Sequence, residues 1–346
     1  MAKETKTQAP LLQVQELKMY FTSRGFFGGE KSCVKAVDGV TFSIQEGQTF
    51  GLVGESGCGK TTTGKCVLRI NEPTEGKIWF GGADITHFSK AELKKIRRQI
   101  QMIFQDPYGS LDPRQSAASI VQEALTAGGE KFRTKNELED QVNALLETVG
   151  LSKELGGRYP HEMSGGQRQR LGIARALACD PKLIVCHEPV SASHVSIQAQ
   201  IINLFKKLQR DFNLTYLFIA HDLAVVQHIA DIIGVMYLGE LVEVMDSEQL
   251  YREASHPYSN ALLAAVPTTN YAEEHSRERV ILAGETPSPL HKPSGCAFHP
   301  RCPYATAECS QKKPALREIA PGHMVACLHP RGAIPDEKGE AGNGKI

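Results

Sequence analysis

The feature that most constrains this chain is a glycine-rich loop between a short apolar run and a helical pattern. Residues 49–53 form an apolar run of strand length, residues 54–61 read Gly-Glu-Ser-Gly-Cys-Gly-Lys-Thr, and a helical pattern covers residues 61–68. The loop matches G-x-x-x-x-G-K-[ST], with the strand and helix that this motif requires on either side. An accidental Gly-rich turn would rarely have all three parts. The sequence therefore predicts a site for nucleotide phosphates.

Each residue type in the loop has its own role at a triphosphate. Glycines let backbone N–H groups turn toward phosphate oxygens, and the N-terminus of the following helix adds positive potential. Lys60 is expected to reach the β- and γ-phosphates, and the Thr61 hydroxyl to bind Mg²⁺. The predicted nucleotide-binding residues of the loop are Gly54, Ser56, Gly57, Gly59, Lys60, Thr61 and Thr62.

The surrounding sequence indicates an α/β fold. Residues 12–44 alternate apolar and polar positions around turns, which is typical of antiparallel strands. Continuous apolar runs at 183–186 and 216–220 suit strands that are buried on both faces of a parallel sheet. The stretch 196–210 between them has a helical pattern. Strands that alternate with helices predict an α/β core beside an antiparallel subdomain.

Composition and charge disfavour several classes of function. The 346 residues include 39 Lys+Arg and 39 Asp+Glu, and this zero net charge disfavours a broad nucleic-acid or anionic-membrane surface. We find no apolar run that could span a bilayer, and residues 1–10 lack the apolar core of a secretory signal. We therefore expect a cytoplasmic protein without a nucleic-acid partner, which reaches a membrane only through partner subunits.

A second small-residue turn opens a later helix. Residues 164–167 read Ser-Gly-Gly-Gln and precede a strand that ends in Glu188. Alone, this turn would be an ordinary helix cap. Combined with the phosphate loop, it resembles the signature of the ABC ATPases, and the resemblance covers residues 12–266. The signature residues are Ser164, Gly165, Gly166 and Gln167.

This resemblance implies a RecA-like P-loop core with an antiparallel β subdomain. It also implies a helical subdomain, about residues 106–162, that carries the signature. Two such domains dimerise head to tail in the family, with ATP between the phosphate loop of one and the signature of the other. Phe21 is placed where the family stacks an aromatic ring on adenine, and Tyr20 is the alternative.

The resemblance also assigns residues around the γ-phosphate. Gln105 matches the loop that senses Mg²⁺ and water and moves with the membrane subunits, so it joins Thr61 as an expected Mg²⁺ residue. Glu188 matches the general base, and a carboxylate can accept the proton of an attacking water. His221 matches the switch histidine at the γ-phosphate. A lone His near a strand end is more often structural, but its spacing from Glu188 favours the catalytic role.

Two histidines depart from the family pattern. His187 stands where the family has the Asp before the catalytic Glu188, and His194 replaces the Asp of a nearby S-A-L-D sequence. The missing Asp normally holds Mg²⁺, which prefers carboxylate oxygen to imidazole. Its loss is expected to cost a few kcal/mol. His194 lies in a loop that helps to position the partner's catalytic apparatus, so it is expected to disturb the opposite site.

These departures lead to the hypothesis that the chain's own ATP site is impaired, while its signature completes a working site in a different partner. The alternatives are that local rearrangement restores activity, or that the two substitutions are not natural. A regulatory or structural subunit without hydrolysis is a further alternative. A non-transport ABC ATPase acting on ribosomes or DNA is disfavoured by the single set of motifs and the absence of a heptad run.

Prolines punctuate the chain after about residue 266. They indicate a loop-rich extension over residues 267–331 that does not continue the sheet. Residues 1–11 and 332–346 are expected to be flexible tails.

The extension contains four cysteines spaced C-x5-C-x6-C-x17-C. Thiolates that converge on a metal would fix a segment with little core of its own. The spacing is neither that of a zinc ribbon nor that of a ferredoxin, and disulfides are not expected in a reducing compartment. The cysteines are Cys296, Cys302, Cys309 and Cys327, and the nearby His299, His323 and His329 could substitute as ligands.

Residues 287–289 and 295–303, with the lead-in at 256–258, resemble the C-terminal extension of the dipeptide/oligopeptide ABC importer ATPases. Some members bind a [4Fe–4S] cluster there, which we favour over zinc and over unliganded thiols. The resemblance implies ATP-driven peptide uptake by a subunit peripheral to the cytoplasmic face of the inner membrane. The implied partners are a paralogous ATPase, two permeases and an extracytoplasmic binding protein. The cargo is not encoded in this chain.

Overall fold

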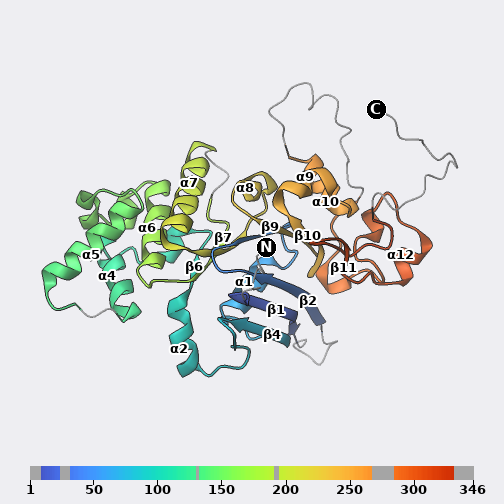
Figure 1. Cartoon of the computed structure of the whole chain (residues 1–346), viewed down its shortest axis with the longest axis horizontal. Helices are drawn as coiled ribbons and strands as arrows, with labels where there is room; N and C mark the ends of the chain where they lie inside the picture. Colours follow the sequence, from blue (N-terminus) through green and yellow to red (C-terminus); the bar gives the residue numbers. More distant parts are fainter. Residues whose placement is uncertain (1–8, 24–31, 130–131, 191–194, 267–283, 331–346) are drawn as a thin grey trace, which may run out of the picture.

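The computed structural model describes residues 9–23, 32–129, 132–190, 195–266 and 284–330, which form two sheets with helices around them (Figure 1). The smaller sheet is antiparallel and packs over the phosphate-loop side of the larger one. Its strands, in spatial order, are β2 (Ser32–Ile44), β1 (Leu12–Ser23), β4 (Glu75–Phe80) and β5 (Ala83–Asp84).

The larger sheet is mixed. Its strands, in spatial order, are β11 (Arg317–Ala320), β12 (His323–Val325), β10 (Glu240–Asp246), β9 (Ile232–Tyr237), β3 (Thr49–Val53), β8 (Thr215–Ile219), β7 (Leu183–His187) and β6 (Ile100–Ile103). Neighbours from β6 to β9 are parallel, and neighbours from β9 to β11 are antiparallel. The expected α/β core is confirmed.

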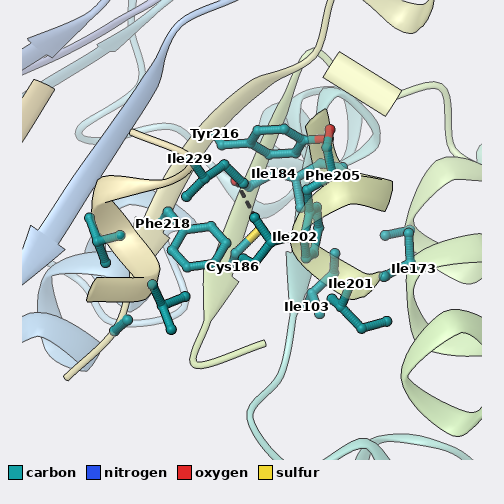
Figure 2. Packing of buried hydrophobic residues seen from close by; sticks show 14 of the residues in the cluster. Ile103, Ile173, Ile184, Cys186, Ile201, Ile202, Phe205, Tyr216, Phe218 and Ile229 are labelled. Atoms are coloured by element: carbon teal, nitrogen blue, oxygen red, sulfur yellow. Dashed lines mark hydrogen bonds between the residues drawn. The ribbon is translucent and has the colours of Figure 1, made fainter. Parts of the chain in front are cut away.

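The central strands are apolar except at their ends because each of their faces meets a separate core. In β7, Ile184 and Cys186 join the core on the helical face, whereas Val185 joins the core under the antiparallel sheet. On the helical face, the ring of Phe205 meets the rings of Tyr216 and Phe218 edge-on, at centroid distances of 5.4 and 5.9 Å (Figure 2). Burial of each such ring contributes roughly 2–3 kcal/mol.

Several helices come next in the chain after a strand of the larger sheet: α1 (Lys60–Val67) after β3, α7 (Val195–Phe212) after β7, α8 (Leu223–Gln227) after β8 and α9 (Ser247–Glu253) after β10. The core also contains α2 (Lys90–Gln99), α6 (Gly165–Leu177) and α10 (Pro257–Ala264). A helical group precedes α6 and lies at one end of the molecule (Figure 1). It contains α3 (Pro107–Ser110), α4 (Ala117–Gly128), α5 (Lys135–Thr148), η1 (Lys153–Gly157) and η2 (Pro160–Glu162).

Side-chain caps explain where the helices of this group begin. Ser116 accepts a hydrogen bond from the backbone of Ser119 at the start of α4, and Thr134 accepts one from Glu137 at the start of α5. Within α5, the apolar face directs Val142 and Leu146 into the core.

The C-terminal extension lies at the opposite end of the molecule (Figure 1). The expectation that it does not continue the sheet is wrong, because β12 pairs with β10 and β11 pairs with β12. These strands, of three and four residues, are too short for the alternation of apolar and polar residues that would predict a strand from the sequence. The remaining elements of the extension are η3 (Pro289–His291), η4 (His299–Arg301) and α12 (Ala307–Gln311).

A buried carboxylate fastens this added strand to the core. Glu243 of β10 is fully buried, and His323 of β12 contacts it with 2.7 Å between Nε2 and Oε1. The same carboxylate accepts hydrogen bonds from the backbone N–H groups of Ser255 and His256, just before α10. One acidic side chain therefore joins β10, β12 and the start of α10.

No helix in the part of the chain that the structure describes is both long and apolar enough to traverse a bilayer.

Candidate nucleotide site

The phosphate loop follows β3 and ends within the first turn of α1. Gly57 and Gly59 have φ angles of 79° and 110°, a region that side chains with a Cβ rarely adopt. A Cβ on Gly59 would also lie 2.2 Å from the carbonyl oxygen of Ala36, and one on Gly54 would lie 2.1 Å from that of Met236. Glycine is therefore required both by the turn and by the close approach of β2 and β9.

Lys60 is folded across the loop. Its side chain is buried, and its ammonium group donates to the carbonyl oxygens of Gly54 at 2.7 Å and Glu55 at 2.9 Å. The Nζ atom also lies 3.6 Å from Sγ of Cys58. These contacts hold the cation at the centre of the turn, where the positive end of α1 also points.

His187 contacts the residue that was predicted to bind Mg²⁺. Its Nε2 atom lies 2.6 Å from Oγ1 of Thr61, so the imidazole of β7 and the hydroxyl of α1 form a hydrogen bond. Burial lowers the pKa of His187, and Lys65 and Lys60 lower it further against the opposing effect of Glu188. The imidazole is therefore neutral at neutral pH and supplies a nitrogen where a carboxylate was expected.

The three predicted catalytic residues converge. Gln105, Glu188 and His221 follow β6, β7 and β8, and parallel strands bring their carboxyl ends to one edge of the sheet. The amide of Gln105 donates to Oε2 of Glu188 at 2.6 Å, and Nδ1 of His221 lies 3.4 Å from Oε1 of the same carboxylate.

The backbone at Glu188 is strained. Its φ is 43°, and its N–H donates to the carbonyl oxygen of Ile219 at 2.8 Å. A non-glycine residue in this region costs on the order of 1–3 kcal/mol. This hydrogen bond to β8 thus fixes the direction of the Glu188 side chain, which is only 19% exposed.

These groups line one cavity of about 330 Å³ at the sheet edge. That volume is at the small end of ligand sites. Some of its lining comes from parts of the chain that the sequence interpretation did not assign to the site. Its lining residues are Val34, Lys35, Ala36, Ser56, Gly57, Gly59, Lys60, Thr61, Thr62, Gln105, His187, Glu188, His221, Leu238, Gly239 and Pro289.

The two candidate aromatic residues lie at the end of β1, outside the lining of that cavity. Tyr20 donates its hydroxyl to Oδ1 of Asp38 at 2.6 Å. Phe21 is 45% exposed and pairs in the β1–β2 register with Val34, which does line the cavity. Phe21 therefore has the freer ring, and its adenine contact stays a prediction.

The signature residues form the start of α6, away from the cavity lining. Ser164 is the N-cap: its hydroxyl accepts from the N–H of Gln167 at 3.3 Å, and its own N–H donates to the Gln167 side chain at 2.9 Å. This reciprocal capping box is complete within four residues. Ser164 and Gly165 are exposed, so the turn faces outward. The other departure, His194, lies outside the described residues.

The four cysteines of the extension are neighbours. The N–H of Cys296 donates to the carbonyl oxygen of Cys309 at 2.8 Å. Burial, together with a smaller effect of the nearby thiols, raises the pKa of Cys296 and of Cys327 to about 11. Burial likewise raises the pKa of Cys302, with an added effect from Cys309.

Even so, no three His, Cys, Asp or Glu side chains are arranged to hold a metal among the described residues. One ring nitrogen of each candidate histidine is already engaged: with the Cys296 carbonyl oxygen for His299, with Glu243 for His323, and with Thr306 for His329. The thiols are gathered, but the described residues do not form a ligand set.

Two features of the site were missed by sequence reasoning. Pro289 of η3 lines the nucleotide cavity, although it lies in the extension. Glu55, in the phosphate loop, accepts hydrogen bonds from Arg301 and Thr286, which also belong to the extension. Only the resemblance of residues 287–289 and 295–303 to a known extension marked these segments, and it did not indicate where they dock.

Comparison with known proteins places this geometry in a family. Residues 37–191 match the model of the ABC transporter family, and residues 242–309 match that of the oligopeptide/dipeptide transporter C-terminal region. The putative oligopeptide transport ATP-binding protein YkfD of Bacillus subtilis is 52% identical over 329 residues, which cover 95% of this chain and 98% of that protein.

Two more relatives agree. The oligopeptide transport ATP-binding protein AppF of Bacillus subtilis is 51% identical, with 92% of this chain and 97% of that protein covered. The protein OppF of Salmonella typhimurium, described in the same words, is 46% identical, with 92% and 96% covered.

Solved structures share the fold of the core. The ATP-binding cassette MJ0796, in a dimeric post-hydrolysis state with ADP and Pi, superposes with a TM-score of 0.61 at 25% identity and covers 68% of this chain and 98% of that one. CbiO1 of Clostridium perfringens superposes with a TM-score of 0.60 at 24% identity, covering 70% and 91%. The chain therefore belongs to the ABC transporter ATPases, the ATP-hydrolysing subunits of transport systems, in the branch that carries the oligopeptide/dipeptide transporter C-terminal region.

Proposed function

We propose that this chain is an ATP-binding subunit that powers the import of dipeptides or oligopeptides. The observation that carries the proposal is the pairing of a nucleotide cavity at the sheet edge with a C-terminal region of the oligopeptide/dipeptide type. Relatives at about half identity are described as oligopeptide transport ATP-binding proteins. Two permeases and an extracytoplasmic binding protein complete the importer, and the chain attaches to the cytoplasmic face of the membrane through the permeases.

Transport by a reconstituted importer tests this function. The chain is combined in proteoliposomes with the permeases, the second ATPase and the binding protein of the proposed importer. Uptake of labelled dipeptides and oligopeptides is then measured with ATP enclosed on the side of the ATPases. We expect ATP-dependent uptake of peptide. ATP-dependent uptake of another cargo with no peptide uptake would contradict the proposed substrate class.

Within this importer, the chain's own ATP site is impaired. The supporting contact is the hydrogen bond between His187 and Thr61, because it places a neutral nitrogen where Mg²⁺ needs an anionic oxygen. The remaining donors are the hydroxyl of Thr61 and the amide of Gln105, which carry no charge. This set fits Mg²⁺ less well than one with a carboxylate. Mg²⁺, when bound, would stabilise charge on the phosphates; Lys60 would still hold the triphosphate, and Glu188 would still be placed to accept a proton.

The test compares the Mg²⁺-dependent ATPase rate of the purified chain with that of a His187→Asp variant. We expect the variant to be about 30-fold faster, which corresponds to roughly 2 kcal/mol of stabilisation from one charged ligand. Mg²⁺ should also strengthen ATP affinity more in the variant than in the wild type. His87→Asp is the matched control, because it makes the same substitution at an exposed turn. Equal rates in wild type and His187→Asp would contradict the impaired site.

The second half of the proposal is a heterodimer with a paralogous ATPase, whose site this chain's signature completes. It is supported by the outward-facing turn at Ser164 and Gly165, whose conformation does not depend on the altered site. In the co-purified pair, Ser164→Arg should abolish ATPase activity, whereas Glu188→Gln in the same chain should leave the rate nearly unchanged. The reverse order would show that this chain's own site does the work.

The four gathered cysteines bind a [4Fe–4S] cluster with a structural role. The support is their mutual proximity within a segment punctuated by proline, and the thiol side chains must turn toward one another to bind it. When bound, the cluster supplies four covalent anchor points. Iron and sulfide analysis of anaerobically purified protein, with absorption near 400 nm, tests it. Stoichiometric zinc without iron would favour a zinc site, and neither metal would favour free thiols.

A further inference from the structure

The C-terminal extension contacts the phosphate loop through the carboxylate of Glu55. Glu55 is the second residue of the loop, and Nη1 of Arg301 donates to both of its oxygens at 3.1 and 2.8 Å. The hydroxyl of Thr286 donates to Oε2 of the same side chain at 2.7 Å. The Arg301 side chain is only 8% exposed, so this ion pair is not a screened surface contact.

The backbone of Glu55 is tied to the residue that handles phosphate. Its carbonyl oxygen accepts from Nζ of Lys60 at 2.9 Å, and its N–H donates to the hydroxyl of Tyr258 at 2.9 Å. The side chain of one residue therefore contacts the extension while its main chain contacts the loop lysine. Arg301 is therefore linked to Lys60 by two hydrogen-bonded contacts, both through Glu55.

Arg301 is itself fixed by the cysteine-bearing segment. It ends η4, which directly precedes Cys302, and the first N–H of that turn, on His299, donates to the carbonyl oxygen of Cys296 at 3.0 Å. On the other side, the ring of Phe298 is buried against Tyr237 and Tyr258, with centroids 5.3 Å away in both cases. The conformation of the cysteine segment therefore sets the position of the guanidinium group.

A second attachment joins the extension to β2 and β10. Lys292 donates to Oδ2 of Asp38 at 3.1 Å and also contacts Glu240. Lys313 contacts Glu240 at 2.5 Å. Between these two attachments, Pro289 forms part of the nucleotide cavity.

Charge gives the pairing a consequence for ATP. The loop binds an anionic triphosphate, yet it carries the carboxylate of Glu55, which lies near enough to Lys60 to be influenced by its charge. Burial raises the pKa of Glu55, but the hydrogen bonds from Arg301 and Thr286 outweigh burial and hold it below its usual range, so it is ionised at neutral pH. Arg301 neutralises this charge. Without it, the carboxylate would repel the phosphates and compete for Lys60.

We propose that Arg301 is a positioning residue for nucleotide binding: by neutralising Glu55, it lets the extension hold the phosphate loop in the form that accepts ATP. The inference rests on the proposed ATP-binding function of this loop. It adds that the affinity of the loop depends on a segment 246 residues further along the chain, whose place is set by the cysteines.

The test is a double-substitution cycle with the full chain, with the dissociation constant for ATP measured by calorimetry. Arg301→Met should weaken binding at least tenfold. Glu55→Gln alone should bind ATP at least as tightly as the wild type. Glu55→Gln combined with Arg301→Met should return to within about threefold of wild type, because the repelling charge is gone. Lys312→Met is the matched control, since Lys312 is exposed and, among the residues that the structure describes, its ammonium group forms an ion pair only with Glu308.

The cycle distinguishes the loss of charge neutralisation in Arg301→Met from damage to the fold of the extension. If Arg301→Met merely unfolded the extension, Glu55→Gln would not restore affinity, and that result would overturn the inference. Unchanged affinity in Arg301→Met would overturn it as well. If the wild-type chain itself bound no ATP, the proposed function would fail instead, so the two failures are distinguishable.

Reciprocity provides an independent arm. If the extension favours ATP, then ATP must favour the docked extension by the same factor. Hydrogen exchange of residues 295–302 should slow when ATP is added to the wild type, and should not slow in the Glu55→Gln/Arg301→Met variant. Equal slowing in both proteins would contradict coupling through this ion pair.

Discussion

The chain has two helix N-termini that the sequence predicts to bind anions, and their conformations are held in different ways. At α6, Ser164 and Gln167 cap each other, so four consecutive residues define the turn. At α1, Gly59 provides no side-chain cap, and the loop depends on β2, β9 and the distant Arg301. The comparison teaches that the signature is encoded locally, whereas the phosphate loop is a product of the whole fold.

The largest expected effect comes from adding one methyl group at each turn. Gly59→Ala should lose ATP binding and about 3 kcal/mol of stability, because its φ is 110° and the new Cβ would meet a carbonyl oxygen at 2.2 Å. Gly165→Ala meets nothing within 4 Å and should be neutral or slightly stabilising. Urea unfolding and ATP titration of both variants check this. If Gly59→Ala and Gly165→Ala lost similar amounts of stability and ATP affinity, the two turns would not differ in how they are held.

A smaller effect is expected from removing the cap of α6. Ser164→Ala should cost about 1 kcal/mol of unfolding free energy, because the N–H of Gln167 loses its acceptor. ATP affinity of the isolated chain should not change, since the signature does not line its own cavity. Thr134→Ala, which removes the cap of α5, is the matched control. A change in ATP affinity of the isolated chain would show that the two turns are coupled.

Another effect, seen only in acid, concerns the second attachment of the extension. Burial raises the pKa of Asp38, but hydrogen bonds from Tyr20 and Lys292 and the charges of Lys292 and Lys313 lower it from 3.8 to about 2. A folded-state pKa below the unfolded value stabilises the fold above pH 3.8, and this contribution is lost as the pH falls toward 2.

The difference in unfolding free energy between wild type and Asp38→Asn reports this contribution. It should be constant between pH 7 and pH 5 and should shrink only in acid below that range. Urea unfolding at a series of pH values measures it. A difference that already declines near neutral pH would mean that another group is responsible.

The predictable part of the structure was the part with short-range causes. Apolar runs gave β7 and β8, because a strand between two cores has no polar face. Glycine chemistry indicated the phosphate loop. The convergence of Gln105, Glu188 and His221, and their roles, were implied by resemblance; the structure shows that they lie after parallel strands, and β6 before Gln105 was not predicted.

The unpredicted part depends on contacts between residues far apart in sequence. His187 contacts Thr61, the residue expected to bind Mg²⁺. Nothing in the sequence indicated that the imidazole would form this hydrogen bond. The pairing of β12 with β10 and the reach of Arg301 to Glu55 were equally invisible. The pairing of β12 and the position of Arg301 both place part of the proline-rich extension against residues whose sequence pattern gave no sign of the contact.

The position of His187 as the last residue of β7 has a consequence for how such a site can change over time. The preceding strand residues are committed to the two cores, whereas His187 is only half-buried and its side chain reaches the nucleotide cavity instead. A substitution there alters chemistry at little expense to folding. The strand end is therefore a place where the chemistry at the cavity can change over time while the strand and the two cores that it joins stay the same.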